Sequence, residues 1–229
     1  PPRSTLFPYT TLFRSFVDYI ALEKTSEYML KEIAKGLLEG AKQSDMPIVG
    51  GETATLPDII KGDGEGFDLA GTCLGVVKKD KIISGKDIVP GDIVIGIASS
   101  GIHSNGLTLA RKVLDEKEYP ELLTPTRIYV KQILELIEKV NVKGMAHITG
   151  SGLFNLKRLK RGLGFDLDLP EPPSIFKKIM DAGVEIEEMY RTFNMGTGFM
   201  VIIPKEEQDK ALQIRSEERR VGKECRSRW

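Results

Sequence analysis

The sequence has few of the residues that build disulfide frameworks, zinc sites and membrane spans. Its 229 residues include two cysteines, two histidines and one tryptophan. Cys225 lies in the last fifteen residues, so the main part of the chain has one thiol, Cys73, which cannot form an internal disulfide. This fits a reducing cytoplasm. No apolar run approaches the roughly 20 residues that span a bilayer, and we expect no membrane partner.

The two ends of the chain are related through the genetic code. When the last fifteen residues are read backwards and their codons complemented, Trp229 (TGG) becomes CCA, a codon for Pro1, and Cys225 (TGT) becomes ACA, a codon for Thr5. All fifteen positions match in this way. We therefore predict that residues 1–15 and 215–229 are non-native tails from a sequencing adapter, with no evolved role and poor packing. A basic tail that binds nucleic acid is the alternative.

The charge balance changes once the tails are set aside. The whole chain has 33 basic and 33 acidic residues, and the tails hold eight and three of these. The remaining 25 basic and 30 acidic residues give a net charge of −5. A mildly acidic chain gives no electrostatic reason to expect nucleic acid as a partner.

Apolar periodicity predicts strands and helices mixed along the chain, so the fold class is α/β or α+β. Expected strands are 16–21, 47–51 (buried, running into a Gly-Gly turn), 68–77, 93–98, 145–148 and 199–203. Thr25 or Ser26 is expected to cap a helix, and its buried face comprises Met29, Leu30, Ile33, Ala34, Leu37, Leu38 and Ala41. Further helices are expected at 107–114, 127–140, 153–161, 172–183 and 205–214. The turn-rich segment 78–90 is the expected boundary between domains 16–85 and 86–214.

Three segments share a pattern of apolar strand, polar glycine-containing turn and helix: PIVGGET, IVIGIASSGIHSNG and MAHITGSG. Glycine lets the backbone approach a ligand closely, and a helix start leaves backbone N–H groups free. Such a turn can hold a phosphate without lysine. Ordinary strand–helix connections use the same residues, but three such turns in one short chain favour a phosphate ligand.

Two carboxylates are candidate metal ligands. Glu52 follows Gly50 and Gly51 at a predicted strand end, where it can bind Mg²⁺ or cap a helix. Asp68 follows the glycine-rich stretch 62–66, as a second ligand, a substrate contact or a turn residue. Both alternatives remain open from the residues alone.

The two histidines lie in glycine-containing turns, without the partners that zinc requires. His103 is the favoured functional candidate, as a proton-transfer group or a hydrogen-bond partner of a reacting oxygen. His147 fits a structural role as well as a functional one. Arg127 opens a predicted helix, where an anion or a nearby carboxylate would compensate its charge. Asn194 lies in a polar loop before the last strand, as a ligand contact or a turn residue.

Five motifs in order resemble the phosphoribosylformylglycinamidine cyclo-ligase (AIR synthetase) family. They are GGETA (50–54), SSGIHSNG (99–106), LTPTRIYV (123–130), MAHITGSG (145–152) and EMYRTFNMGTG (188–198). The resemblance covers nearly all of 16–214. It implies a two-domain AIR-synthetase-like fold whose first domain is incomplete on its N-terminal side.

The resemblance also implies a reaction. ATP phosphorylates the amide oxygen of formylglycinamidine ribonucleotide, an amidine nitrogen attacks that carbon, and phosphate leaves as the imidazole ring closes. ATP and Mg²⁺ are the implied cofactors, with Glu52 as metal ligand and catalytic together with His103. The implied substrate contacts are Ser100, Gly101, Ser104, Asn105, Gly106, Thr149, Gly150, Arg191, Thr192 and Asn194. Gly50, Gly51, Thr53 and Asp68 fall on the ATP and dimer side, and the intact enzyme is expected to be a cytoplasmic homodimer in which 68–77 contributes to the pairing.

The chain departs from the family in two respects. Ser151 stands where the family usually has glycine, which costs about 1 kcal/mol if that position needs positive φ. Family members also begin about a third of a chain earlier, so we expect this polypeptide to be inactive alone. The alternatives are another ATP-dependent enzyme of the superfamily, such as formylglycinamide ribonucleotide amidotransferase, a non-catalytic phosphoribosyl binder, or an inert fragment.

Overall fold

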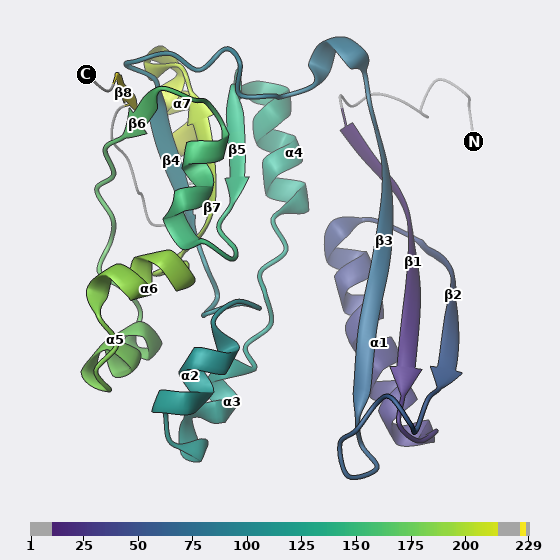
Figure 1. Ribbon diagram of the computed structural model, residues 1–229. Coiled ribbons are helices and arrows are strands. Elements are labelled where there is room, and N and C mark those ends of the chain that lie inside the picture. The colour runs from purple at the N-terminus through teal and green to yellow at the C-terminus, as the bar shows by residue number, and fades with distance from the viewer. Residues whose placement is uncertain (1–10, 215–224, 228–229) are drawn as a thin grey trace, which may run out of the picture. The chain divides into compact units, whose positions relative to one another are not determined.

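The computed structural model describes residues 11–214 and 225–227, which form two compact units (Figure 1). The first unit comprises the residues up to Ile82 together with 128–135. The second comprises 83–127 and the residues from Leu136 onward. The segment 128–135, which the sequence analysis assigned to the second domain, thus lies in the first unit.

The first unit is built around a three-stranded sheet with the order β2-β1-β3. Its elements are β1 (Thr11–Leu22), α1 (Glu27–Ser44), β2 (Ile48–Thr55) and β3 (Phe67–Val77). β1 pairs in parallel with β2 and antiparallel with β3. Because parallel neighbours need a crossover, α1 forms that connection as a β-α-β unit. A short 3₁₀ helix, η2 (Lys79–Lys81), follows β3.

Helix α1 begins where the sequence predicts. The hydroxyl of Ser26 accepts a hydrogen bond from the backbone N–H of Met29 at 3.3 Å, which satisfies one of the free N–H groups of the first turn. Asp45 ends the helix with φ 53°. Within the predicted buried face, Ala34 and Leu38 are exposed instead. The helix therefore packs through a narrower stripe than its periodicity suggests.

The predicted Gly-Gly turn at Gly50–Gly51 is absent, and the prediction of a buried strand there is wrong. Both glycines lie inside β2, which continues to Thr55, and the strand is exposed along nearly its whole length. No helix follows this segment directly. The carboxylate of Asp18 explains why position 51 is glycine, because a Cβ at this position would lie 2.5 Å from Asp18 Oδ1. The glycine makes room for a neighbouring side chain and does not turn the chain.

Parts of both predicted tails take part in the sheets through backbone pairing, and their non-native origin stays a prediction. Residues 11–15 belong to β1 and pair with β3. Residues 225–227 form β8 (Cys225–Ser227) and pair with β6 (Leu163–Phe165). Backbone hydrogen bonding is independent of side-chain identity, so an open strand edge accepts any extended segment. Residues 1–10, 215–224 and 228–229 lie outside the described part of the chain.

The second unit contains the remaining elements. Its other strands are β4 (Ile93–Ala98), β5 (Gly144–His147) and β7 (Thr197–Ile203). Its α-helices are α2 (Leu107–Val113), α3 (Tyr119–Leu122), α5 (Ser174–Asp181), α6 (Ile186–Thr192) and α7 (Gln208–Gln213). Its 3₁₀ helices are η3 (Glu116–Glu118), η4 (Gly152–Arg158) and η5 (Lys205–Glu207). Helix α4 (Val130–Lys139) passes from the first unit into the second.

Two expected helices differ in form. The segment predicted as a helix over 153–161 is the 3₁₀ helix η4, and the helix predicted over 127–140 begins only at Val130. Residues 124–129 belong to no helix or strand, so α4 begins three residues later than the apolar period predicts.

The second unit has a filled core on its sheet, which has the antiparallel order β4-β7-β5. Val94, Met200 and Ile202 pack with Ile88 and Leu156 in one cluster. A second cluster joins the helices α2, α5 and α6, and in it the rings of Phe176 and Phe193 meet edge to face at 6.0 Å. This unit provides a rigid base for the turns at its sheet end.

A buried ion pair joins the opposite end of the same sheet. Lys143 Nζ lies 2.6 Å from Asp92 Oδ1, and both side chains are largely enclosed. The other carboxylate oxygen of Asp92 accepts a hydrogen bond from the N–H of Val89. Within the described residues, no helix is both long enough and apolar enough to cross a membrane.

Candidate functional site

Three turns meet at one end of the sheet in the second unit. β4 and β5 finish there at Ala98 and His147, and β7 begins there at Thr197. The register pairs Ala98 with Thr197 and His147 with Phe199. The turn after β4 (99–106), the turn after β5 (148–152) and the turn before β7 (193–196) are therefore neighbours, as the antiparallel order requires.

Asn194 ties two of these turns together. Its side chain is 3% exposed. Its amide nitrogen donates to Gly101 O at 2.9 Å, and its oxygen accepts from Ser99 Oγ at 2.8 Å and from Gly196 N at 2.9 Å. These bonds direct the Asn194 side chain into the protein, so the structure supports a turn-building role for it more than a contact with a ligand.

The turn after β4 is closed by His103. The backbone N–H of Ser100 donates to His103 Nε2 at 3.1 Å, and the hydroxyl of Ser100 donates to Pro125 O at 2.6 Å. His103 has φ 61°, in the left-handed region that histidine tolerates better than most residues. The helix α2 follows immediately after Gly106, whose φ is 82°.

The turn after β5 depends on two positive φ angles and one asparagine. Ser151 has φ 80° and Gly152 has φ 51°. A Cβ on Gly152 would lie 2.1 Å from Tyr190 O, so glycine is required there. Asn155, from η4, donates to Gly150 O at 3.0 Å and to Gly152 O at 2.8 Å. Ser151, which stands where the family usually has glycine, therefore has the strained positive φ that we expected. Arg158 donates a hydrogen bond to the Ser151 hydroxyl at 3.2 Å.

The turns also approach each other through their glycines. A Cβ on Gly150 would lie 3.1 Å from Asn105 Oδ1, which places the Asn105 amide beside the turn after β5. A Cβ on Gly106 would lie 2.3 Å from the ring of Phe193. Glycine at positions 106 and 150 therefore lets the three turns pack closely together.

The histidines of the site are held neutral by their surroundings. Burial is the main cause that lowers the pKa of His103 to about 4, and His147 and Arg127 add to it. The rings of the two histidines lie 6.3 Å apart, and His147 stacks on Phe199 at 5.9 Å. Partial burial also lowers the pKa of His147 below its usual value. Both imidazoles are uncharged near pH 7.

The remaining predicted substrate contacts surround these turns. Ser104 and Gly150 are exposed, and Thr149 and Asn105 are half-buried at the rim. Arg191 and Thr192 lie at the C-terminal end of α6. Arg191 is exposed, whereas the hydroxyl of Thr192 donates to Glu188 one helical turn earlier. The side chains that face outward are thus Ser104, Asn105, Thr149 and Arg191.

The first unit holds the predicted metal and ATP residues. Glu52 is exposed and accepts a hydrogen bond from the N–H of Thr53 at 2.9 Å. On β2, Glu52 pairs with Tyr19 of β1, and on β3, Asp68 pairs with Ala21 of β1. Tyr19 and Ala21 are two residues apart on the same strand, so both carboxylates lie on one face of the sheet. Within the described residues, no group of three or more His, Cys, Asp and Glu side chains is arranged to hold a metal ion.

Three polar residues that support these turns and the first sheet are absent from the sequence predictions. Ser99 and Asn155 hold the turns from within, and Asp18 lies against Gly51. Asp18 pairs with Gly51 on β2 and with Gly71 on β3. The glycines at positions 51 and 71, each in a predicted strand, were the available signal that a larger side chain such as Asp18 lies between them. Nothing in the local sequence distinguishes Asn155 from an ordinary helix residue.

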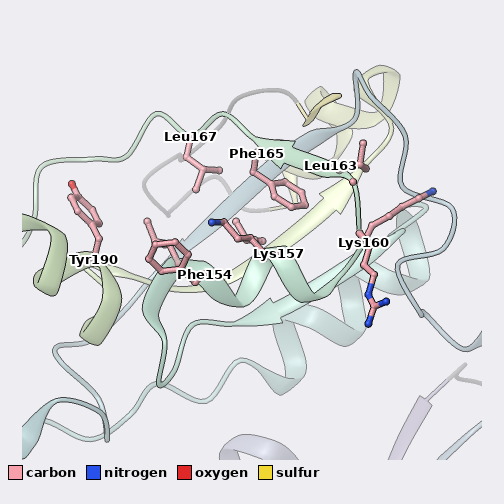
Figure 2. A pocket seen from close by; sticks show the side chains of 12 residues that line it. Phe154, Lys157, Lys160, Leu163, Phe165, Leu167 and Tyr190 are labelled. Carbon is pink, nitrogen blue, oxygen red and sulfur yellow. The ribbon is translucent and has the colours of Figure 1, made fainter. Parts of the chain in front are cut away.

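A hollow of about 500 Å³ lies beside η4 and β6 (Figure 2). Its wall is largely apolar, with Phe154, Phe165 and Leu167 around it, and Lys157 Nζ lies 4.4 Å from the centre of the Phe154 ring. None of the site residues predicted from the sequence lines this hollow. The hollow adjoins the turn after β5, because Leu153 follows that turn directly and Tyr190 O lies against Gly152.

The fold is shared with solved structures of mixed helix and strand content. The structure resembles a hydrogenase maturation protein HypE solved in complex with ATP, with a TM-score of 0.68 at 18% sequence identity. The match covers 96% of this chain and 67% of that one. At this identity the likeness shows the fold alone.

Sequence comparison then gives the family. Residues 89–223 match the C-terminal domain of AIR synthase related proteins, and residues 13–77 match the N-terminal domain. The chain belongs to the AIR synthase related protein family, as the five motifs predicted.

Curated relatives agree with this assignment. The chain is 56% identical over 211 residues to a phosphoribosylformylglycinamidine cyclo-ligase of Pyrococcus horikoshii, and 52% identical over 217 residues to one of Methanosarcina barkeri. Each match covers 87% of this chain. The chain spans 62% and 63% of the length of these two relatives.

Proposed function

We propose that the chain belongs to an enzyme that closes the imidazole ring of aminoimidazole ribonucleotide in purine biosynthesis, at the expense of ATP. The observation that carries this proposal is the identity of more than half of the aligned residues to proteins named phosphoribosylformylglycinamidine cyclo-ligase. The meeting of three glycine-containing turns in the second unit supports it, because backbone N–H groups in such turns suit a sugar phosphate.

The second unit supplies the substrate side of this proposal. Ser104, Asn105 and Thr149 offer hydroxyl and amide groups at the rim of the turns, and Arg191 offers an exposed cation. A guanidinium binds phosphate through two parallel hydrogen bonds, so Arg191 suits the 5′-phosphate of a ribonucleotide. Gly101, Gly106 and Gly150 belong to the same turns, where the absence of a side chain lets the turns pack closely and brings these contacts together.

The chemistry requires activation of an amide oxygen, which is a poor leaving group. Transfer of the γ-phosphoryl group of ATP to that oxygen makes it leave as phosphate when the amidine nitrogen attacks the same carbon. The nitrogen loses its proton as the ring closes. The protein contributes by holding the two reacting groups of one substrate in contact and by offsetting phosphate charge.

The first unit supplies the nucleotide side. ATP is the proposed nucleotide, as the relatives named phosphoribosylformylglycinamidine cyclo-ligase imply, and Gly50, Gly51 and Thr53 are the proposed contacts. Glu52 is the proposed ligand of Mg²⁺, which takes one or two protein carboxylates and completes its shell with phosphate and water. Asp68 lies on β3, with β1 between it and Glu52, and is a proposed contact on the ATP side. When bound, Mg²⁺ would offset the charge of the transferred phosphoryl group.

A second copy of the chain is the proposed partner. Val17, Tyr19, Leu74 and Val76 lie on one face of the first unit's sheet and are all exposed. An exposed apolar face of this kind marks an interaction surface, and closed pairing of two copies would cover it. Sedimentation equilibrium tests this, with a dimer as the expected result and a monomer at all concentrations as the contrary one.

Calorimetry with formylglycinamidine ribonucleotide and with ATP, followed by an assay of ring closure, tests the proposed function. We expect the substrate to bind with its phosphate required, so that the dephosphorylated nucleoside binds at least about tenfold more weakly. Lack of substrate binding would contradict the proposal. Binding without turnover would favour the expectation that this chain needs the remaining length of its relatives. Dependence on ammonia would favour the amidotransferase alternative, which the named relatives do not support.

A further inference from the structure

We propose that His103 is a neutral positioning residue that fixes the turn after β4, and that it is not the group that transfers a proton during ring closure. The proposal rests on the proposed function for the identity of the substrate. Its physical basis lies in the hydrogen bond between Ser100 and His103, which does not depend on that substrate.

The direction of that bond defines the protonation state of the imidazole. The N–H of Ser100 donates to His103 Nε2 at 3.1 Å. A ring nitrogen accepts a hydrogen bond only when it carries no proton, so the neutral ring has its proton on Nδ1. Protonation of Nε2 would turn this acceptor into a donor facing another donor and would break the bond.

The surroundings of His103 favour the same state. Its side chain is 5% exposed, and Nδ1 is buried. The titratable groups that face it are His147, with ring centres 6.3 Å apart, and the cation of Arg127. Both oppose a positive charge on His103, as does its burial.

The bond closes the turn that carries the proposed substrate contacts. Ser100 and His103 are three residues apart, and Gly101 between them accepts the hydrogen bond from Asn194. Ser104 and Asn105 follow directly. His103 therefore determines where these two side chains lie, through a backbone conformation with φ 61°.

Proton transfer fits this geometry poorly. A general base needs a free acceptor nitrogen, and Nε2 is already used by Ser100. Nδ1 carries the proton and is enclosed by protein. Loss of the Nδ1 proton would leave an imidazolate anion, which histidine does not form near neutral pH. The amidine proton must therefore leave to another acceptor, such as solvent or the released phosphate.

Nitrogen-15 NMR of the whole chain tests the tautomer directly. The sequence contains only two histidines, so the imidazole spectrum is simple, and a His147→Gln variant assigns the signals. We expect one bare nitrogen at Nε2 and one protonated nitrogen at Nδ1 for His103, unchanged from pH 7.5 to 5.5. A proton on Nε2, or a charged ring at pH 7, would overturn the proposal whether or not the substrate binds.

Two matched variants test the positioning role. In His103→Gln, the amide oxygen can reach the place of Nε2 and accept the Ser100 N–H. In His103→Asn, the side chain suits positive φ but is too short to do so. We expect H103N to weaken binding of formylglycinamidine ribonucleotide by about tenfold and H103Q to restore most of that loss. Equal losses in both variants would contradict the proposal.

Discussion

The two main sheets of the molecule each have three strands, yet β3 of the first sheet and β4 of the second are buried to opposite extents. Every residue of β3 in the first unit is exposed. All residues of β4 in the second unit are buried except Ala98. Backbone hydrogen bonding forms both sheets equally well, so strand formation alone does not establish a core. The second unit has packed side chains on its sheet, and the first unit presents apolar side chains to its surroundings.

This contrast predicts that the second unit depends on individual side chains far more than the first. The difference in burial also distinguishes the two parts of the candidate site. The turns at the end of a filled sheet are held by buried residues, whereas Glu52 and Asp68 lie on an exposed sheet face. The predictions below test the contrast, beginning with the largest expected effect.

Phe193→Ala is expected to lower the free energy of unfolding by about 3–5 kcal/mol, because it leaves a cavity in a core where Phe193 is 0% exposed. Urea unfolding followed by circular dichroism measures the effect. The matched control is Phe67→Ala in β3, where the side chain is 50% exposed and the cost is expected to stay below about 1 kcal/mol. Equal losses for the two variants would remove the contrast.

Lys143→Ala is expected to cost about 3 kcal/mol, because it leaves the carboxylate of Asp92 buried without its cation. The double variant Asp92→Asn with Lys143→Met removes both charges and is expected to recover much of the loss. Thermal melts of the three proteins measure the difference. A single variant as stable as the parent would show that the ion pair contributes little to the second unit.

Acidification is expected to destabilise the second unit. The pKa of His103 is lowered to about 4 by burial, from the ordinary value of 6.5. The unfolded chain therefore binds more protons between these values, and stability is lost as pH falls from about 6.5 to 4. The loss is about 1.4 kcal/mol per pH unit at most, and about 2–3 kcal/mol over the window. Urea unfolding at pH 7 and pH 5 checks this, and His103→Gln is expected to reduce the slope.

Leu74→Ala is expected to change the stability of the monomer by less than about 0.5 kcal/mol, because the side chain is 61% exposed. The same change is expected to weaken self-association, since Leu74 lies on the proposed pairing face. Unfolding at low protein concentration separates the two effects. A large loss of monomer stability would show that this face is buried within a single chain.

The sequence predicted well what depends on local pattern. The cap of α1 at Thr25 or Ser26, the strand at 68–77 and the order of turns around His103 and Asn194 all follow from residue type and period. The family assignment followed from motifs at these turns. All of these features are determined by residues that are close together in the sequence.

The features that the sequence did not predict depend on distant contacts. Gly51 looks like a turn residue until Asp18 of the neighbouring strand is seen beside it. Asn194 looks like a ligand contact until its bonds to Ser99 and Gly101 are known. The roles of Asn155 and of His103 Nε2 likewise depend on partners that the three-dimensional turn brings together.

The central claim is that the turns 99–106 and 148–152 of the second unit, held from within by 193–196, bind the ribonucleotide phosphate together. Amide hydrogen exchange with and without formylglycinamidine ribonucleotide tests it most directly. The account predicts slowing by at least about tenfold within 99–106, 148–152 and 193–196 at once, with β2 and β3 unchanged. Protection confined to one of these turns, or found only in the first unit, would contradict it.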